Sequence, residues 1–246
     1  MDRLIYIAMT GAKHIMEQQA NTAHNLANVA TTGFRAQLDT FRAVPVVSDG
    51  LPTRAFVVDS TAGTDFAQGA LQQTGRSLDV AIQGKGWIAV QMPDGSEAYT
   101  RHGNLKTTEN GVLQTASGLS VLGDGGPISL PPDVDVAIGG DGTISSTERA
   151  GKPGQANVLG RIKLVNPPED SLVRGDDGMF RIRDGGQADA DATIRVAGGA
   201  LEGSNVNAVD AMVNMISLGR QFEMHMSLLK NAESNSAKAS QLMNLS

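Results

Sequence analysis

The sequence predicts an α+β protein with a long helix at each end and an all-β body between them. All but two of its 29 glycines and all nine prolines lie between Gly33 and Gly203, so the residues that break helices are concentrated in the middle. Apolar residues near both ends recur at three- and four-residue steps, the period of a helix, whereas those in the middle alternate with polar residues, the period of a strand. Each predicted helix needs a partner for its apolar face, either the other helix or a neighbouring copy.

Residues 1–33 are predicted as the N-terminal helix. Its apolar and small residues fall on one side when they are placed on a helix: Ile5, Ala8, Ala12, Ile15, Ala23 and Leu26. Thr31 and Thr32 are β-branched, and Gly33 accepts the positive φ that ends many helices. We therefore predict that the helix stops at Gly33, in the left-handed conformation, and that Phe34 begins the next segment.

Residues 34–70 are predicted as an extended connector with one hairpin. They show no long period, and a short run of β-favouring residues at 56–58 indicates a strand. Prolines and glycines interrupt the segment at Pro45, Gly50, Pro52, Gly63 and Gly69.

Residues 71–203 are predicted as a β-rich domain. Large apolar residues stand at every second position at 78–82 and 88–90, and further alternating runs lie at 134–138, 158–165, 179–183 and 193–196. Tight turns separate the runs: Pro93-Asp94-Gly95 has proline and glycine where turns need them, and Asn110-Gly111 is a hairpin signal. Regularly spaced short strands of this kind indicate an all-β body.

Residues 204–246 are predicted as the C-terminal helix, with Ser204 and Asn205 as its N-cap residues. Its apolar residues keep near-helical spacing over most of the segment: Val206, Val209, Val213, Ile216, Phe222, Met226, Leu229 and Ala232. Few globular helices are this long, which favours a coiled coil or bundle.

No pattern in the sequence supports catalysis, a cofactor or a metal. Cysteine is absent, which excludes disulfides, thiolate zinc sites and cysteine nucleophiles. Gly84, Gly86 and Ala89 match a loose dinucleotide-binding pattern, but a strand is predicted at 87–91 where that pattern requires a helix. The four histidines lack a second ligand at helical spacing. We predict that the protein is not an enzyme and binds no small-molecule substrate.

The charge and hydropathy of the chain exclude two further classes. The net charge of −6 comes without a basic block, which argues against nucleic-acid binding. No apolar run approaches the roughly 20 residues that cross a bilayer, and charged residues interrupt the first 20. We expect neither a membrane span nor a cleaved signal peptide.

Two stretches, NLANVATTGF at 25–34 and LEGSNVNAVDAMVNMI at 201–216, strongly resemble the terminal signatures of the flagellar axial proteins, the rod and hook family of bacteria. The body and the tail are also similar, most of all to a proximal-rod member, so the likeness spans the chain. His24 and Ala30 stand where the family usually has asparagine, and Ala208 stands where proline is common. These differences touch helix ends and leave the apolar stripe intact.

The resemblance implies a structural subunit of the proximal rod in the flagellar basal body, which transmits torque and spans the periplasm. It implies that the terminal helices pair as an inner coiled-coil layer that lines the channel, with the β-rich domain outside. The implied partners are other copies of the chain, other rod proteins including the distal-rod protein FlgG, and the flagellar type III export apparatus. Two alternatives stay open: a distal-rod protein of the same family, and an oligomeric β-domain that binds peptide or carbohydrate.

The candidate assembly residues lie in the two helices and beside their inner ends: Ile5, Ala12, Ile15, Asn25, Leu26, Asn28, Gly33, Phe34, Asn205, Asn207, Val209, Val213, Ile216, Phe222, Met226 and Leu229. The apolar members are predicted to form a buried seam. The asparagines, together with Asn214, are candidates for amide hydrogen bonds that fix register, as polar residues do inside coiled coils. The alternative is that they cap and solvate helix ends.

Overall fold

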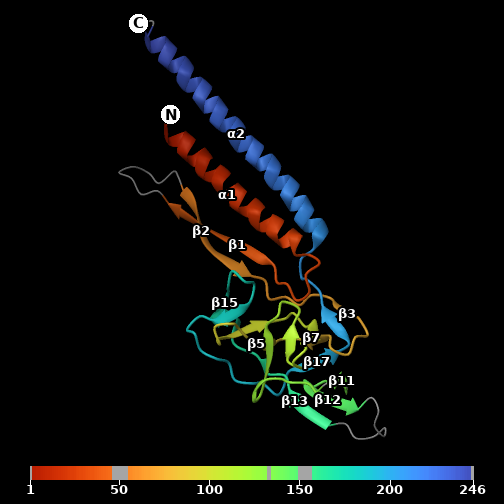
Figure 1. The fold of residues 1–246 in the computed structure, drawn as a ribbon. Helices are drawn as coiled ribbons and strands as arrows, with labels where there is room; N and C mark the ends of the chain where they lie inside the picture. The colour runs from red at the N-terminus through yellow and green to blue at the C-terminus, as the bar shows by residue number, and fades with distance from the viewer. Residues whose placement is uncertain (1, 46–54, 132–133, 149–156, 245–246) are drawn as a thin grey trace. The chain divides into compact units, whose positions relative to one another are not determined.

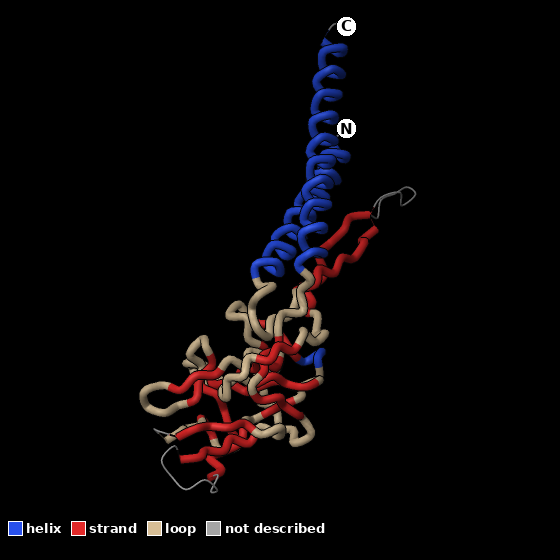
Figure 2. The backbone as a smooth tube through the Cα atoms, turned by 90° about the vertical axis from the view of Figure 1, so that its right-hand side faces the viewer, coloured by secondary structure: helices blue, strands red, loops and turns tan. Residues whose placement is uncertain are grey.

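A computed structural model describes residues 2–45, 55–131, 134–148 and 157–244 of the 246-residue chain. The chain divides into two compact units, which we call the helical unit and the β unit. The helical unit comprises Met1–Val29, Ala36–Asp65 and Val206–Ser246, and the β unit comprises Ala30–Arg35 and Phe66–Asn205. Helices at the two ends and a β-rich middle confirm the predicted α+β class (Figure 2).

The helical unit contains both long helices and one strand pair. Helix α1, Asp2–Ala27, and helix α2, Ala208–Asn244, lie side by side and run antiparallel (Figure 1). Strands β1, Gln37–Pro45, and β2, Ala55–Thr64, pair antiparallel and pack against α1. This pair confirms the strand pairing predicted in the connector, whose Gly50 and Pro52 lie outside the described residues.

The β unit is built from short antiparallel strands. Its largest sheet has nine strands, seven of them in the order β15-β16-β6-β5-β9-β8-β7, with β10 beside β9 and β14 beside β5. These strands are β5 Trp87–Gln91, β6 Glu97–Thr100, β7 Leu105–Thr107, β8 Leu113–Thr115, β9 Ser120–Gly123, β10 Gly126–Pro127, β14 Leu164–Val165, β15 Leu172–Arg174 and β16 Phe180–Ile182. A 3-10 turn, η1 Glu169–Ser171, precedes β15.

Three smaller sheets complete the described part of the unit. Strands β11 Val134–Ile138, β12 Thr143–Glu148 and β13 Asn157–Arg161 form one of them. In the other two, strands from the end of the unit pair with strands from its start: β17 Arg195–Gly198 with β4 Val80–Gln83, and β18 Ala200–Glu202 with β3 Leu71–Gln73. The last strands of the unit therefore close against its first strands.

Strand β5 lies between two hydrophobic cores. Ile88 and Val90 belong to the larger core, whereas Trp87 and Ala89 belong to a smaller one that also contains Phe180. Successive side chains of a strand point to opposite faces, so each face of β5 is covered. The alternation at 88–90 therefore correctly predicts a strand, but Trp87 and Ala89 are buried as well.

The predicted turns and strands agree with the structure where they can be compared. Gly95 and Gly111 have φ of 83° and 79°, and Gly111 lies in the turn that joins β7 to β8. The dinucleotide pattern fails as expected, because β5 is a strand and no helix follows Gly86. The alternating runs at 134–138, 158–165, 179–183 and 193–196 contain strands β11, β13, β14, β16 and β17.

Two predictions about helix ends are wrong. Helix α1 ends at Ala27, before Thr31–Gly33. At this end, the side chain of Asn28 donates a hydrogen bond to the carbonyl oxygen of His24 at 2.9 Å. Gly33 does have the predicted positive φ, 68°, but in the segment after the helix. The cap of α2 is Asn207, whose Oδ1 accepts from the Val209 N–H at 3.0 Å, and neither Ser204 nor Asn205 has that position.

Candidate assembly surface and linker site

In the helical unit, one face of α2 packs against α1. Apart from Gly219, its buried and half-buried residues follow each other at alternating steps of three and four: Ala208, Ala211, Met215, Leu218, Phe222, His225, Leu229 and Ala232. On α1 the buried residues are Ala8, Ala12 and Ile15, which follow the same spacing. Strict alternation of three and four is a period of 3.5, the repeat with which two helices stay in contact over many turns.

Gly11 allows the two helices to approach where His225 lies between them. A Cβ atom placed on Gly11 would lie 2.5 Å from Cε1 of His225, closer than side chains approach each other. Nδ1 of His225 is buried and has no hydrogen-bond partner among the described residues. The glycine is therefore needed for packing, even though glycine is a poor helix former.

Gly11→Leu is expected to destabilise the helix pair by about 1–3 kcal/mol, because the added side chain overpacks the contact with His225. The measurement is chemical unfolding of the purified chain followed by the helical circular dichroism signal. Gly219→Leu is the matched control, because a Cβ at Gly219 meets nothing within 4 Å and the change improves helix propensity. Equal effects of the two substitutions would contradict this packing role.

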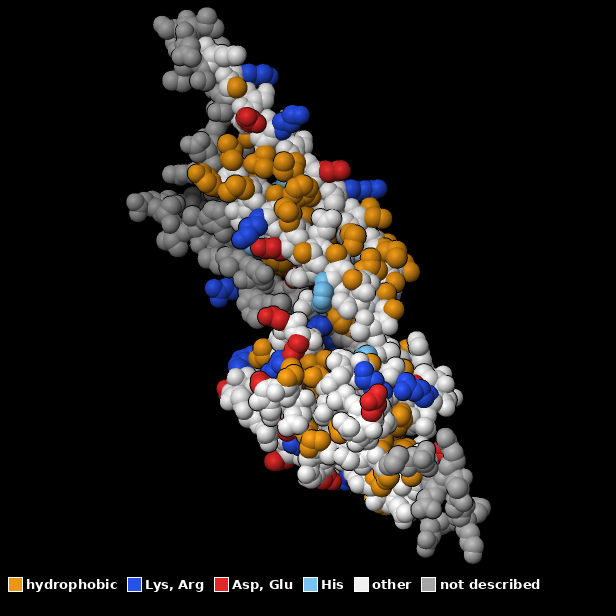
Figure 3. Space-filling model, viewed as in Figure 1, with side chains coloured by type: hydrophobic (Ala, Val, Ile, Leu, Met, Phe, Trp, Pro, Cys, Tyr) orange, Lys and Arg blue, Asp and Glu red, His pale blue; other side chains and the backbone are white. Residues whose placement is uncertain are grey.

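Each helix carries a second apolar stripe that is exposed in the single chain. On α1 it follows the buried stripe by one position and consists of Tyr6, Met9, Met16, Ala20, Ala23 and Ala27, interrupted by Lys13. On α2 it occupies the first turns: Val209, Met212, Val213 and Ile216, which are 68%, 52%, 59% and 60% exposed. Figure 3 shows hydrophobic side chains gathered along the helices. Apolar patches of this kind mark interaction surfaces.

The predicted assembly residues separate into these two sets. Ala12 and Ile15 are buried between the helices, and Ile5, Leu26, Phe222 and Leu229 are half-buried. Val209, Val213, Ile216 and Met226 are exposed and do not contribute to the packing of α2 on α1. In the single chain, the predicted apolar residues of α2 therefore fall into one stripe that α1 covers and one that is exposed. Two neighbouring stripes with a period near 3.5 resemble one broad stripe with a period of 3.6.

The candidate asparagines have different hydrogen bonds. Asn25 holds the backbone of β1: its Nδ2 donates to the Gln37 carbonyl oxygen and its Oδ1 accepts from the Gln37 N–H, both at 2.9 Å. Asn205 donates from Nδ2 to the Ala67 carbonyl oxygen at 3.1 Å. Asn28 and Asn207 cap helix ends, as the alternative interpretation held, and Asn214 is exposed.

Asn25→Leu is expected to cost about 1–3 kcal/mol of unfolding free energy, because it leaves a donor and an acceptor of Gln37 without their partners. Hydrogen exchange of the Gln37 amide in the purified chain measures the loss directly. Asn28→Leu is the control, since its hydrogen bond is exposed and water can replace the amide. If Gln37 exchanges equally fast in both variants, Asn25 does not anchor β1.

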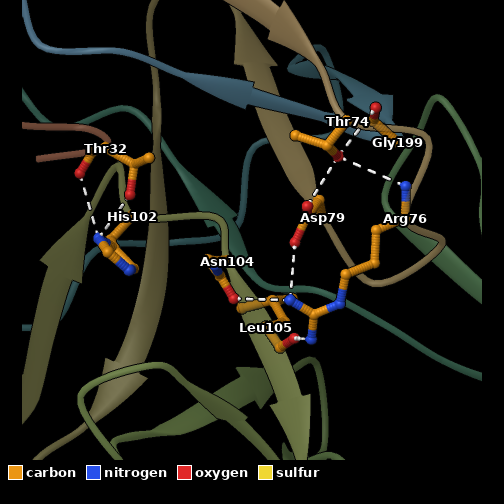
Figure 4. Close-up of polar contacts among 8 residues, drawn as sticks. All are labelled: Thr32, Thr74, Arg76, Asp79, His102, Asn104, Leu105 and Gly199. Carbon is orange, nitrogen blue, oxygen red and sulfur yellow. Dashed lines mark hydrogen bonds and ion pairs between the residues drawn. The ribbon is translucent and has the colours of Figure 1, made fainter. Parts of the chain in front are cut away.

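In the β unit, the segment Ala30–Arg35 is held by the strand that precedes α2 in the sequence. The Gly33 N–H donates to the Glu202 carbonyl oxygen at 2.7 Å, and the Asn205 N–H donates to the Phe34 carbonyl oxygen at 3.3 Å. Phe34 is buried, with the Arg174 guanidinium 4.6 Å from its ring centre. Nδ1 of His102 lies 2.9 Å from Thr32 Oγ1 and 3.1 Å from the Thr32 carbonyl oxygen (Figure 4).

A buried cluster of charges lies beside this segment. Arg35 and Glu202 are each 1% exposed and Arg101 is 6% exposed. Arg35 Nη1 is 2.7 Å from Glu202 Oε1, and Arg101 Nη1 is 2.8 Å from Glu202 Oε2. One carboxylate thus faces two guanidinium groups, which is a costly arrangement in a protein interior unless each charge is well paired.

Burial lowers the pKa values of two arginines of the β unit, Arg101 and Arg174. Burial lowers the pKa of Arg101; the Glu202 carboxylate opposes that shift and the charge of Arg35 adds to it. Burial alone lowers the pKa of Arg174. A guanidinium group nevertheless stays protonated at neutral pH. Sequence analysis did not identify the cluster of Arg35, Arg101 and Glu202. Their pairing follows from the order of the strands, and no local sequence pattern indicates it.

Elsewhere in the β unit, further ion pairs join loops and strands. Figure 4 shows Arg76, which donates to Asp79, to Asn104 and to the Leu105 carbonyl oxygen. Glu97 and Lys163 form a second pair, with Nζ 2.8 Å and 3.0 Å from the two carboxylate oxygens. This second pair lines a polar pocket of about 550 Å³. The charges of Glu97 and Lys163 offset each other, and Asp124 and Asp189 also line the pocket.

Two family models match separate segments of the chain. Residues 81–146, in the β unit, match the model of the flagellar hook protein FlgE/F/G D1 domain. Residues 197–242 match the model of the flagellar basal body rod FlgEFG protein C-terminal. The flagellar basal-body rod protein FlgF of Escherichia coli (strain K12) is 46% identical over 252 residues, which cover 100% of both chains.

This chain belongs to the FlgF family of flagellar basal-body rod proteins. FlgF of Salmonella typhimurium is 45% identical, again over 100% of both chains. The flagellar basal-body rod protein FlgG of Buchnera aphidicola subsp. Schizaphis graminum is 30% identical, over 97% of this chain and 98% of the relative. The resemblance to rod and hook proteins seen in the terminal signatures is confirmed.

The FlgF family is one of structural proteins and not of enzymes, in agreement with the predicted lack of catalysis. Among the described residues, no three histidine, aspartate or glutamate side chains are grouped so that they could hold a metal ion. In the same residues, no helix is both long and apolar enough to cross a bilayer.

Proposed function

We propose that this member of the FlgF family is a structural subunit of the proximal rod, and that it assembles through both terminal helices. The observation that carries the proposal is the second apolar stripe on each helix. One face of each helix is used within the chain, and a further apolar face stays exposed. A neighbouring subunit that covers those stripes would remove them from water.

The spacing of the stripes supports a coiled-coil arrangement. The buried stripe of α2 follows a period of 3.5 from Ala208 to Ala232, and the exposed stripe of α1 follows the same period from Tyr6 to Ala27. Helices with a second stripe of this kind can pack on more than one partner and so form a closed layer around an axis. In this proposal the layer lines the channel of the rod and transmits torque.

The wider assignment rests on the family. We expect other copies of the chain and other rod proteins, including FlgG, as neighbours, and export through the flagellar type III apparatus without cleavage of a signal peptide. The completed rod would span the periplasm. Identity of 46% to an FlgF protein, against 30% to an FlgG protein, supports the proximal over the distal position. It also favours a rod subunit over the oligomeric binding module.

Cysteine labelling tests the surface without interference, because the chain has no cysteine of its own. Ile216→Cys is expected to react with a maleimide in the purified chain and to be protected in rods isolated from cells. Gln221→Cys, an exposed polar position on the same helix, is the control and should be protected less. Equal labelling of Ile216→Cys in the purified chain and in rods would exclude this stripe as an interface.

A further inference from the structure

We propose that Glu202 acts as a latch for the N-terminal linker, residues 30–35, which docks into the β unit only after strand β18 has brought the Glu202 carboxylate into place. This inference concerns the β unit and does not depend on the proposed assembly through the helices.

Glu202 holds four groups at once. Its Oε1 lies 2.7 Å from Arg35 Nη1 and accepts from the Gly69 N–H at 3.0 Å, and its Oε2 accepts from Arg101 at 2.8 Å. Its backbone carbonyl oxygen accepts from the Gly33 N–H at 2.7 Å. A single residue of β18 therefore binds the linker by both its side chain and its backbone.

Arg35 depends on this carboxylate more than Arg101 does. Arg101 also donates to the Gly84 carbonyl oxygen at 2.6 Å and lies 5.5 Å from the centre of the Trp87 ring. In the described part of the chain, Nε, Nη1 and Nη2 of Arg35 are buried without hydrogen-bond partners, and the ion pair of Nη1 with Glu202 supplies its carboxylate. A buried charge without its partner is strongly unfavourable. Without the Glu202 carboxylate, we therefore expect the linker to detach from the β unit.

The position of Glu202 in the fold sets the order of events. It lies in β18, the last strand of the β unit, which pairs with β3 through the register Glu202 to Leu71. Before β18 pairs with β3, the Arg35 guanidinium group has no carboxylate with which to form an ion pair, and it stays solvated. The linker at the start of the chain is thus fixed by a strand from the end of the unit.

Hydrogen exchange of the full-length chain tests the latch. Glu202→Gln keeps the shape of the side chain and removes its charge, and it is expected to speed exchange of the amides at 33–35 by about tenfold or more. Exchange in β4 and β5 should change far less. Glu97→Gln is the control, since it breaks another ion pair of the same unit, the half-buried Glu97–Lys163, that does not touch the linker. It should not release residues 33–35 selectively.

A second variant separates a latch from a general loss of stability. Arg35→Met removes the buried cation, so the double variant E202Q/R35M is expected to regain protection of the linker that E202Q has lost. Regained protection supports the latch even if E202Q alone does not fold. Failure of R35M to restore the linker in the E202Q chain overturns it, because the effect of Glu202 would then not act through Arg35.

Pulsed exchange during refolding of the unmodified chain tests the order. Residues 33–35 should become protected together with residues 200–202 or later. Protection of 33–35 before β18 would overturn the latch, as would equal release of the linker in E202Q and E97Q.

Discussion

Cells that carry Val213→Asp are expected to complete no rods and to lose motility, although the purified variant folds. Val213 is 59% exposed in the single chain, so a charge there should change the unfolding free energy by no more than about 0.5 kcal/mol. When a neighbouring helix covers the stripe, the same carboxylate becomes buried without a partner, at a cost of several kcal/mol. Basal bodies purified from the cells and a motility assay measure the effect.

Gln221→Asp provides the control for this prediction, because Gln221 is an exposed polar residue on the same helix. It should leave rods and motility intact. Near-ultraviolet circular dichroism of Trp87, which is buried in the β unit, reports whether that unit is folded in both variants. Normal swimming of Val213→Asp cells would remove the α2 stripe from the assembly surface.

Gly33→Val is expected to destabilise the β unit by more than any exposed substitution in the linker. A Cβ at Gly33 would lie 2.4 Å from the carbonyl carbon of Arg101 and 2.5 Å from its oxygen, and backbone atoms cannot swing aside as a side chain can. The positive φ of 68° adds about 1–2 kcal/mol for a residue with a side chain. Urea unfolding of the purified chain measures the total.

Gly75→Val separates the clash from the backbone strain. Gly75 has nearly the same φ, 71°, but a Cβ there meets nothing within 4 Å. Its variant should therefore cost about 1–2 kcal/mol, the strain alone. If Gly33→Val costs no more than Gly75→Val, the linker adapts to the side chain and the close approach to Arg101 has no importance for stability.

The fold class and most strands could be predicted from the sequence because their signals are local. Alternation identified β5, and Asn110-Gly111 identified the turn between β7 and β8, since each depends on residues within a few positions. The end of α1 was harder to place. Thr31–Gly33 looked like a stop, but the Asn28 side chain already caps the last turn.

The two faces of α2 show what periodicity alone leaves undecided. Val213 and Phe222 both fit a helical stripe, yet only Phe222 faces α1, because which stripe is covered depends on the partner helix. The pairing of Arg35 with Glu202 depends in the same way on the tertiary fold. The residues come from opposite ends of the β unit, and they meet where β18, which carries Glu202, pairs with β3.

The position of β5 between two cores has a consequence for the thermodynamics of the β unit. Ile88 and Val90 belong to one core, and Trp87 and Ala89 belong to the other. Neither core can therefore unfold while β5 stays paired with its neighbouring strands. A single central strand shared in this way couples the two cores into one cooperative unit. Calorimetry should accordingly find one heat-absorption peak for the β unit, with equal calorimetric and van't Hoff enthalpies, although its side chains form two separate hydrophobic clusters.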